Sequence, residues 1–226
     1  MTTTISQKSK PALDGERRFL IRGVGWEGYQ SLLRLVGDQC IRLTYDRGDV
    51  ELISPLFKHE RKKCFFGQVV RILAEELNIP LMPVGSTTLS REEVDRGLEP
   101  DEGFYLGELE RIRDPDQIDL DVDPPPDLAI EIEITRSALD RVGVYGALGV
   151  PELWRFNGQT LRVLIRQEDG AYRESPTSAA FPEVAMDEVA RFASMEGIRD
   201  EIEWARRFRM WVREDVLPRT QGRGDA

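Results

Sequence analysis

The sequence is short of cysteine and has no long apolar run. Its two cysteines, Cys40 and Cys64, offer no disulfide framework, and their separation matches no metal-ligand spacing. No stretch of about 18 apolar residues occurs, so no transmembrane helix is expected. The opening segment, MTTTISQKSK, lacks the apolar core of a secretory signal. We therefore expect a protein of the reducing cytoplasm.

Positive charge is also in deficit. The chain has 31 Lys and Arg against 41 Asp and Glu, and its formal net charge is −10. An acidic surface repels nucleic-acid phosphate, so the composition argues against tight non-specific DNA binding. Carboxylates that bind metal ions contribute to this total, however, and a nuclease is not excluded. The 40% hydrophobic and 32% charged content is typical of a folded globular protein.

The apolar pattern predicts an α/β protein with one mixed sheet, flanking helices and one core. Residues 1–16 are polar and aperiodic, which predicts a disordered tail. Apolar residues at helical spacing indicate helices over 24–36 and 59–77. Between them, IRLTY and VELIS flank the turn DRGD and predict a hairpin. Further strands are expected around 82–89 and 99–107.

The second half of the chain continues this alternation. RSALDRVGVYGALGV has a helical pattern, and Asn-Gly and Asp-Gly dipeptides after it predict two hairpins. Residues 196–214 predict an amphipathic helix, so we divide the chain into a domain over 17–195 and a C-terminal helix and tail over 196–226. The apolar face of this helix carries Trp204, Phe208 and Trp211. Such a face predicts packing on the core or a homodimer contact.

The stretch DLAIEIEIT, residues 127–135, reads as a strand with an apolar row on one face. Glu131 and Glu133 lie two residues apart and share the other face. Asp101, in EPDEGFY, is expected on a neighbouring strand. Because Mg²⁺ usually takes one or two carboxylates with water and substrate phosphate, these acids predict a candidate phosphodiester-cleaving site. The same alternation is typical of a strand with one solvated face, so spacing alone leaves both interpretations open.

Four segments carry a resemblance to a known family. GDVELISPLFKHERKK, RGLEPDEGFYLG, PPPDLAIEIEIT and YGALGVPELWRFNG, in this order, resemble the Uma-two endonucleases of the PD-(D/E)XK superfamily. The resemblance runs from about Gly25 to Phe192. It implies a restriction-endonuclease-like α/β fold and a DNA endonuclease that uses Mg²⁺ (or Mn²⁺). Asp101 and Glu131 would bind the metal, and Glu133, which would assist catalysis, stands where the superfamily often has lysine.

One position departs from the family pattern. The resemblance implies that the lysine is displaced onto the following helix, in a K-x-x-x-Y arrangement, where this chain has Arg141 and Tyr145. Lysine can share a proton with a nucleophilic water, whereas arginine stays charged, so we expect altered or impaired catalysis. Arg141 retains the charge needed to stabilise a transition state. Its other interpretation is a helix arginine paired with a neighbour such as Asp140.

The segment KHERKK at the start of the second helix is the densest basic cluster. The resemblance places His59 and Glu60 in the same cleft, with Glu60 as an outer catalytic carboxylate and His59, Lys62 and Tyr145 as substrate-binding groups. The cluster would meet a phosphate backbone. Alternatively it is a solvated helix face, with Glu60 favoured there by the positive end of the helix dipole.

Two functions other than an active nuclease are alternatives. A catalytically degenerate member of the family, kept as a binding or scaffolding module, is suggested by Arg141 and by the net charge of −10. A glycosidase with paired carboxylates is disfavoured, because Glu131 and Glu133 lie on one strand and not across a cleft.

Overall fold

Two β-sheets form the framework of the computed structural model, which describes residues 17–37, 39–114, 116–133, 136–194 and 199–221. The predicted tail over 1–16 lies outside these ranges. The five-stranded sheet is antiparallel, in the order β1 (Arg17–Ile21), β3 (Asp49–Ser54), β2 (Arg42–Asp46), β6 (Arg96–Leu98), β5 (Leu89–Arg91). The six-stranded sheet has the order β11 (Tyr172–Ser175), β10 (Leu161–Arg166), β9 (Glu152–Phe156), β8 (Leu128–Ile132), β7 (Glu102–Leu106), β4 (Leu81–Pro83). It is mixed, because β8 and β9 are parallel and its other pairs are antiparallel.

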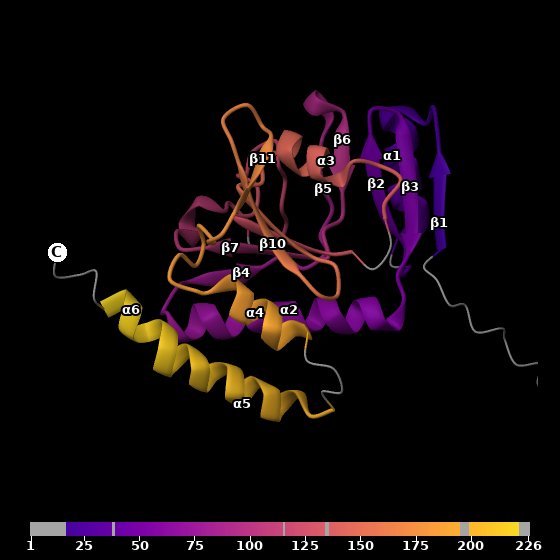
Figure 1. Ribbon diagram of the computed structural model, residues 1–226. Coiled ribbons are helices and arrows are strands. Elements are labelled where there is room, and N and C mark those ends of the chain that lie inside the picture. The colour runs from indigo at the N-terminus through magenta and orange to yellow at the C-terminus, as the bar shows by residue number, and fades with distance from the viewer. Residues whose placement is uncertain (1–16, 38, 115, 134–135, 195–198, 222–226) are drawn as a thin grey trace, which may run out of the picture.

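Helices cover both sheets (Figure 1). The long helix α2 (Phe57–Glu76) runs beneath the six-stranded sheet, with α4 (Met186–Ser194) and α5 (Glu201–Trp211) on the same side. The helix α1 (Gly25–Val36) packs on the five-stranded sheet. The remaining helical segments are α3 (Arg141–Leu148), α6 (Leu217–Gln221), a π-helical turn over Val212–Val216, and 3₁₀ turns over Glu92–Val94 and Leu109–Arg111. Among the described helices, none is long and apolar enough to cross a membrane.

The first predicted hairpin is confirmed as β2 and β3. Asp46 pairs with Asp49, which leaves a two-residue turn of Arg47 and Gly48. Both turn residues have positive φ, 47° and 94°, the conformation that a tight hairpin needs to match the twist of its strands. The Asn-Gly and Asp-Gly hairpins are likewise present between β9, β10 and β11. The predicted helices over 24–36 and 59–77 correspond to α1 and α2.

The prediction of a single core is wrong. One hydrophobic cluster lies between α2, the C-terminal helices and the face of β8 that carries Leu128, Ile130 and Ile132. A second joins α3 to the opposite face of that sheet and to Leu89 and Leu98 of the smaller sheet. The third lies between α1 and the β2–β3 hairpin. Helix α3 is therefore packed between the two sheets, and β8 is buried on both faces.

The prediction of one sheet is also wrong. Of the strand expected over 82–89, only β4 forms within that range, and β5 begins at its last residue in the other sheet. Strands β1, β5 and β6 were missed. The segments LSR and RGL of β5 and β6 are three residues long and charged, so they show no alternating pattern. They form because they pair with each other and with β2.

The C-terminal helix differs from its predicted bounds. Helix α5 begins at Glu201, and the predicted start over 196–198 lies outside the described residues. The Asp200 carboxylate caps the helix by accepting hydrogen bonds from the Ile202 and Glu203 N–H groups. Trp204 and Phe208 are 3% and 0% exposed and join the cluster beneath the six-stranded sheet. Trp204 and Phe208 are thus packed inside the chain, which is one of the two predicted alternatives, and the homodimer contact stays a prediction.

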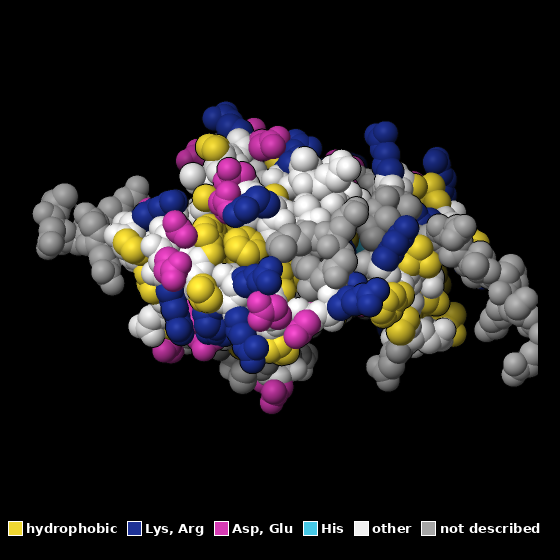
Figure 2. Space-filling view, turned by 60° about the horizontal axis from the view of Figure 1, so that its bottom comes forward, with side chains coloured by type: hydrophobic (Ala, Val, Ile, Leu, Met, Phe, Trp, Pro, Cys, Tyr) yellow, Lys and Arg dark blue, Asp and Glu magenta, His cyan; other side chains and the backbone are white. Residues whose placement is uncertain are grey.

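The face made by α2 and the C-terminal helices carries mixed charge (Figure 2). Lys and Arg side chains lie there among Asp and Glu side chains. Glu76 of α2 accepts hydrogen bonds at 2.6 Å from both Arg209 and Arg213. Arg209 and Arg213 therefore hold the C-terminal helical segment against α2.

Truncation of Phe208 tests whether the C-terminal helices belong to the folded core. Phe208→Ala removes a fully buried ring and should lower the free energy of unfolding by about 3–5 kcal/mol, measured by urea denaturation. Ile202→Ala, on the same helix but 60% exposed, is the control and should have little effect. Equal effects of the two substitutions would show that α5 is an independent appendage.

Candidate active site

Asp101 lies between β6 and β7 and is tied to the end of β8. Glu102 pairs with Ile130, so the register continued by one residue sets Asp101 across from Glu131. Asp101 is 3% exposed, and its Oδ2 accepts a hydrogen bond of 2.6 Å from the Ile132 N–H. His59 Nε2 lies 3.2 Å from the same oxygen, and Arg42 pairs with Oδ1. A buried carboxylate is thus held beside Glu131 by one backbone and two side-chain donors.

Glu131 projects from β8 toward α3 and is 7% exposed, so the solvated-face interpretation is wrong for this residue. The guanidinium of Arg141 donates to both carboxylate oxygens, from Nη2 at 2.5 Å and from Nε at 3.0 Å. The Tyr145 hydroxyl, one turn along α3, donates to Oε1. Asp140 does not pair with Arg141; it caps α3 by accepting from the Gly143 N–H at 3.1 Å.

Burial and the Glu131 charge fix the protonation of the two partners. Burial opposes the charge on Arg141, but the adjacent Glu131 carboxylate outweighs it and raises the pKa of the guanidinium above its ordinary value. Burial, reinforced by the Glu131 charge, raises the pKa of Tyr145 well above its usual range. Both groups therefore keep their protons at neutral pH. They can donate hydrogen bonds to an anion, but neither can act as a general base.

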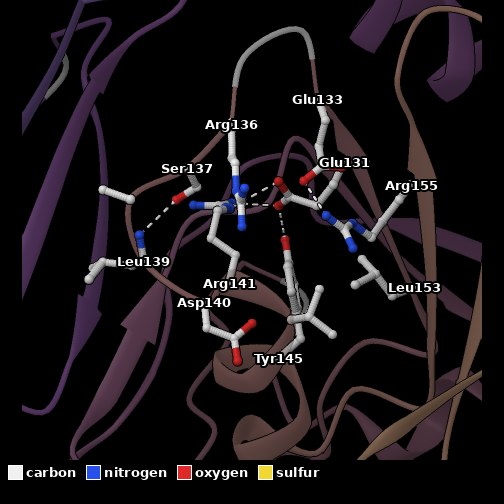
Figure 3. A pocket seen from close by; sticks show the side chains of 12 residues that line it. Glu131, Glu133, Arg136, Ser137, Leu139, Asp140, Arg141, Tyr145, Leu153 and Arg155 are labelled. Carbon is white, nitrogen blue, oxygen red and sulfur yellow. Dashed lines mark hydrogen bonds and ion pairs between the residues drawn. The ribbon is translucent and has the colours of Figure 1, made fainter.

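Glu133 has its own arginine. It follows β8, its N–H donates to the Phe156 carbonyl at 2.8 Å, and its carboxylate pairs with Arg155 of β9. The Glu133 side chain is 34% exposed. Figure 3 shows the two glutamates side by side, with Arg141 on one flank and Arg155 on the other.

Two neighbouring cavities open beside these acids. The larger, of about 350 Å³, is lined by three arginines (Arg136, Arg141 and Arg155) together with Glu131 and Glu133 (Figure 3). The smaller, of about 30 Å³, is the one that Asp101 reaches. It is lined by Asp101, Glu131, Glu133, His59, Arg42 and Arg141, among others. The structure thus brings the predicted acid pair to one small cavity, which shares Glu131, Glu133 and Arg141 with a larger one rich in arginine.

The other predicted site residues divide into two groups. His59 is 6% exposed in the first turn of α2 and lines the small cavity. Glu60 points elsewhere: it pairs with Arg42 at 2.5 Å and lines a third cavity of about 470 Å³. Lys62 turns toward α4, where its ammonium donates to the Ala193 carbonyl at 2.7 Å and lies over the ring of Phe65. Of the predicted basic cluster, Lys62 therefore holds α4 and does not face the two site cavities.

Three residues that hold the acids and the start of α3 in place were not predicted from the sequence. Arg42 pairs with Asp101, and Arg155 pairs with Glu133. Glu51 of β3 is fully buried, and its carboxylate accepts from the Ser137 hydroxyl and from the Ala138 N–H at 3.0 Å. It thereby fixes the segment that leads into α3. The sequence signal for Glu51 is its position as a charged residue within the largely apolar strand VELIS.

By donor type, Asp101 and Glu131 fit a divalent ion. Both supply the carboxylate oxygens that Mg²⁺ prefers, and both line the small cavity. All four of these oxygens, however, accept hydrogen bonds or ion pairs from groups of the protein. Within the described ranges, no three acidic, His or Cys side chains converge to hold a metal ion. In this arrangement guanidinium groups occupy the place of the cation.

The mixed α/β architecture, with two sheets flanked by helices, is that of a restriction-endonuclease-like protein. The chain belongs to the Uma2 family, described as "putative restriction endonuclease", whose pattern matches residues 26–193. The predicted family and fold class are thereby confirmed. No curated protein matches the chain. Family membership supports a nuclease but assigns no role to individual residues.

Removal of either glutamate tests the energetic difference between the two ion pairs. Glu131→Ala leaves the guanidinium of Arg141 buried without its counter-ion and should lower the free energy of unfolding by about 3–5 kcal/mol. Glu133→Ala affects a pair that solvent reaches and should cost less than about 1 kcal/mol. Urea denaturation at neutral pH measures both. A loss for Glu133→Ala as large as that for Glu131→Ala would contradict this assignment of burial.

Proposed function

We propose that this protein is an endonuclease that cleaves phosphodiester bonds of DNA at the cavity between Asp101 and Glu131, with Mg²⁺ or Mn²⁺ as cofactor. The observation that carries the proposal is the 2.6 Å hydrogen bond from the Ile132 N–H to Asp101, which keeps one buried carboxylate beside another at a single cavity. Membership of a restriction endonuclease family supports the same activity.

The acidic pair would hold the metal. A bound divalent ion supplies a water of lowered pKa and neutralises charge on the phosphate. Asp101 is the more easily released ligand, because its partner Arg42 also contacts Glu60 and keeps a carboxylate when Asp101 is withdrawn. His59, 3.2 Å from Asp101 Oδ2, orients that carboxylate.

The arginines of the larger cavity would bind the substrate. Arg136, Arg141 and Arg155 line it, and guanidinium groups form strong paired hydrogen bonds with phosphate oxygens. Because Arg141 and Tyr145 keep their protons, they would stabilise negative charge on the phosphate and leave proton removal to other groups. A local arginine cluster of this kind reconciles DNA binding with a net charge of −10.

A catalytically degenerate binding module is the second candidate. It is favoured by one observation, the complete occupation of the Asp101 and Glu131 oxygens by protein donors. We propose a cytoplasmic location for either candidate, because Cys40 and Cys64 are free and exposed, which fits a reducing compartment.

Nicking of supercoiled plasmid in millimolar Mg²⁺ or Mn²⁺ tests the nuclease. The wild-type protein should produce nicked and linear DNA, and Asp101→Asn and Glu131→Gln should each lower the rate by more than about 100-fold, since even outer-shell changes at metal sites cost 10–100-fold. Glu174→Gln, which removes a 54% exposed carboxylate on β11, is the matched control and should nick like the wild type. Absence of nicking by the wild type, or equal nicking by all four proteins, would sink the proposal in favour of the binding module.

A further inference from the structure

Arg141 makes contacts with both sheets at once. Its Nε and Nη2 donate to Glu131 on β8 of the six-stranded sheet. Its Nη1 donates to the Thr44 hydroxyl on β2, and Nη2 also donates to the Glu99 carbonyl at 2.8 Å, just after β6. Thr44 and Glu99 belong to the five-stranded side of the cavity. The guanidinium is therefore a bridge between the two sheets, and its side chain is only 11% exposed.

These contacts use the shape of the guanidinium. Arginine has five N–H donors in a rigid planar fork, and four hydrogen bonds engage three nitrogens in three directions here. A lysine ammonium has three donors on one atom and cannot make the same bridge. The cap that Asp140 provides for α3 fixes the start of the helix, and Tyr145 adds a donor to Glu131 from its next turn.

Asp101 and Glu131 differ in what happens to their arginine partners when a metal ion takes the carboxylate. Arg42 contacts Asp101 and Glu60, so a cation that takes Asp101 leaves Arg42 with a second carboxylate at 2.5 Å. The other acceptors of Arg141 are a hydroxyl and a backbone carbonyl. A divalent ion that takes Glu131 therefore leaves a buried guanidinium with no carboxylate in direct contact, and like charges lie close together in a medium of low dielectric constant.

We propose that Arg141 is the resident cation of Glu131 and competes with the divalent metal for this carboxylate. Without DNA the wild-type protein then binds Mn²⁺ weakly and without Glu131, since no substrate phosphate is present to replace that carboxylate as the partner of Arg141. Replacement by lysine, the residue of the family pattern, frees one or both oxygens and creates a metal site. The inference rests on the proposed function only in taking this cavity as the place where a metal binds.

Calorimetric titration with Mn²⁺ tests the competition directly. Arg141→Lys should bind Mn²⁺ at least tenfold more tightly than the wild type, and the double variant Arg141→Lys/Glu131→Gln should lose that gain. Arg162→Lys is the matched control: it makes the same exchange at the pair with Glu174, which lines neither site cavity, and should leave the affinity unchanged. Thermal melting shows that each variant is folded.

Two results would overturn the inference. One is a wild-type Mn²⁺ affinity that falls tenfold or more in Glu131→Gln, because Glu131 would then bind the metal while Arg141 is present. The other is a folded Arg141→Lys protein with no gain in affinity. If Arg141→Lys does not fold, the comparison of wild type with Glu131→Gln decides alone: equal affinities support the inference and a tenfold loss contradicts it.

Plasmid nicking at limiting Mn²⁺ separates this inference from the proposed function. Both hold if Arg141→Lys nicks at least tenfold faster than the wild type. A gain in Mn²⁺ affinity without nicking by either protein supports the competition and rejects the nuclease. Glu131-dependent nicking by the wild type, with no gain in Arg141→Lys, supports the nuclease and rejects the competition.

Discussion

The ion pair between Glu131 and Arg141 lies where the two sheets meet, and most features of the site follow from its burial. A carboxylate and a guanidinium withdrawn from water are tolerated only when each is fully hydrogen-bonded. Thr44, Glu99 and Tyr145 supply the remaining partners, and they come from the smaller sheet and from α3. The pair therefore fixes the positions of the elements around it as well as the charge between them.

The same pairing recurs at each acid of the site. Asp101 has Arg42, and Glu133 has Arg155. An excess of negative charge over the whole chain is thus compatible with a cavity that is locally balanced and, on its larger side, lined by cationic side chains. Net charge describes solubility and long-range attraction, whereas recognition of a phosphate depends on the side chains within hydrogen-bonding distance.

Much of the framework was readable from periodicity and turn chemistry. Helices α1 and α2, the turn at Arg47 and Gly48, and the apolar row of β8 all follow local rules. Glu131 was a candidate because it is an acid within an apolar strand, and the resemblance to the Uma-two motif added Asp101 as its partner. The strands β5 and β6 were not found, since three-residue segments depend on their partners in space.

The arginine partners of the acidic residues could not be predicted from the sequence either. Arg42 and Asp101 are far apart in the chain, and their contact exists only once β2 and β7 are placed on either side of the cavity. The division of the core into three clusters could not be predicted for the same reason. Helix α3 packs against both sheets, and the apolar periodicity of its sequence does not show this.

Glu51 restrains the segment that leads into α3. It is buried in β3 and grips Ser137 and Ala138, so the approach to α3 is fastened to the hairpin sheet. Any displacement of Ser137 and Ala138 therefore either breaks their hydrogen bonds to Glu51 or carries strand β3 with it.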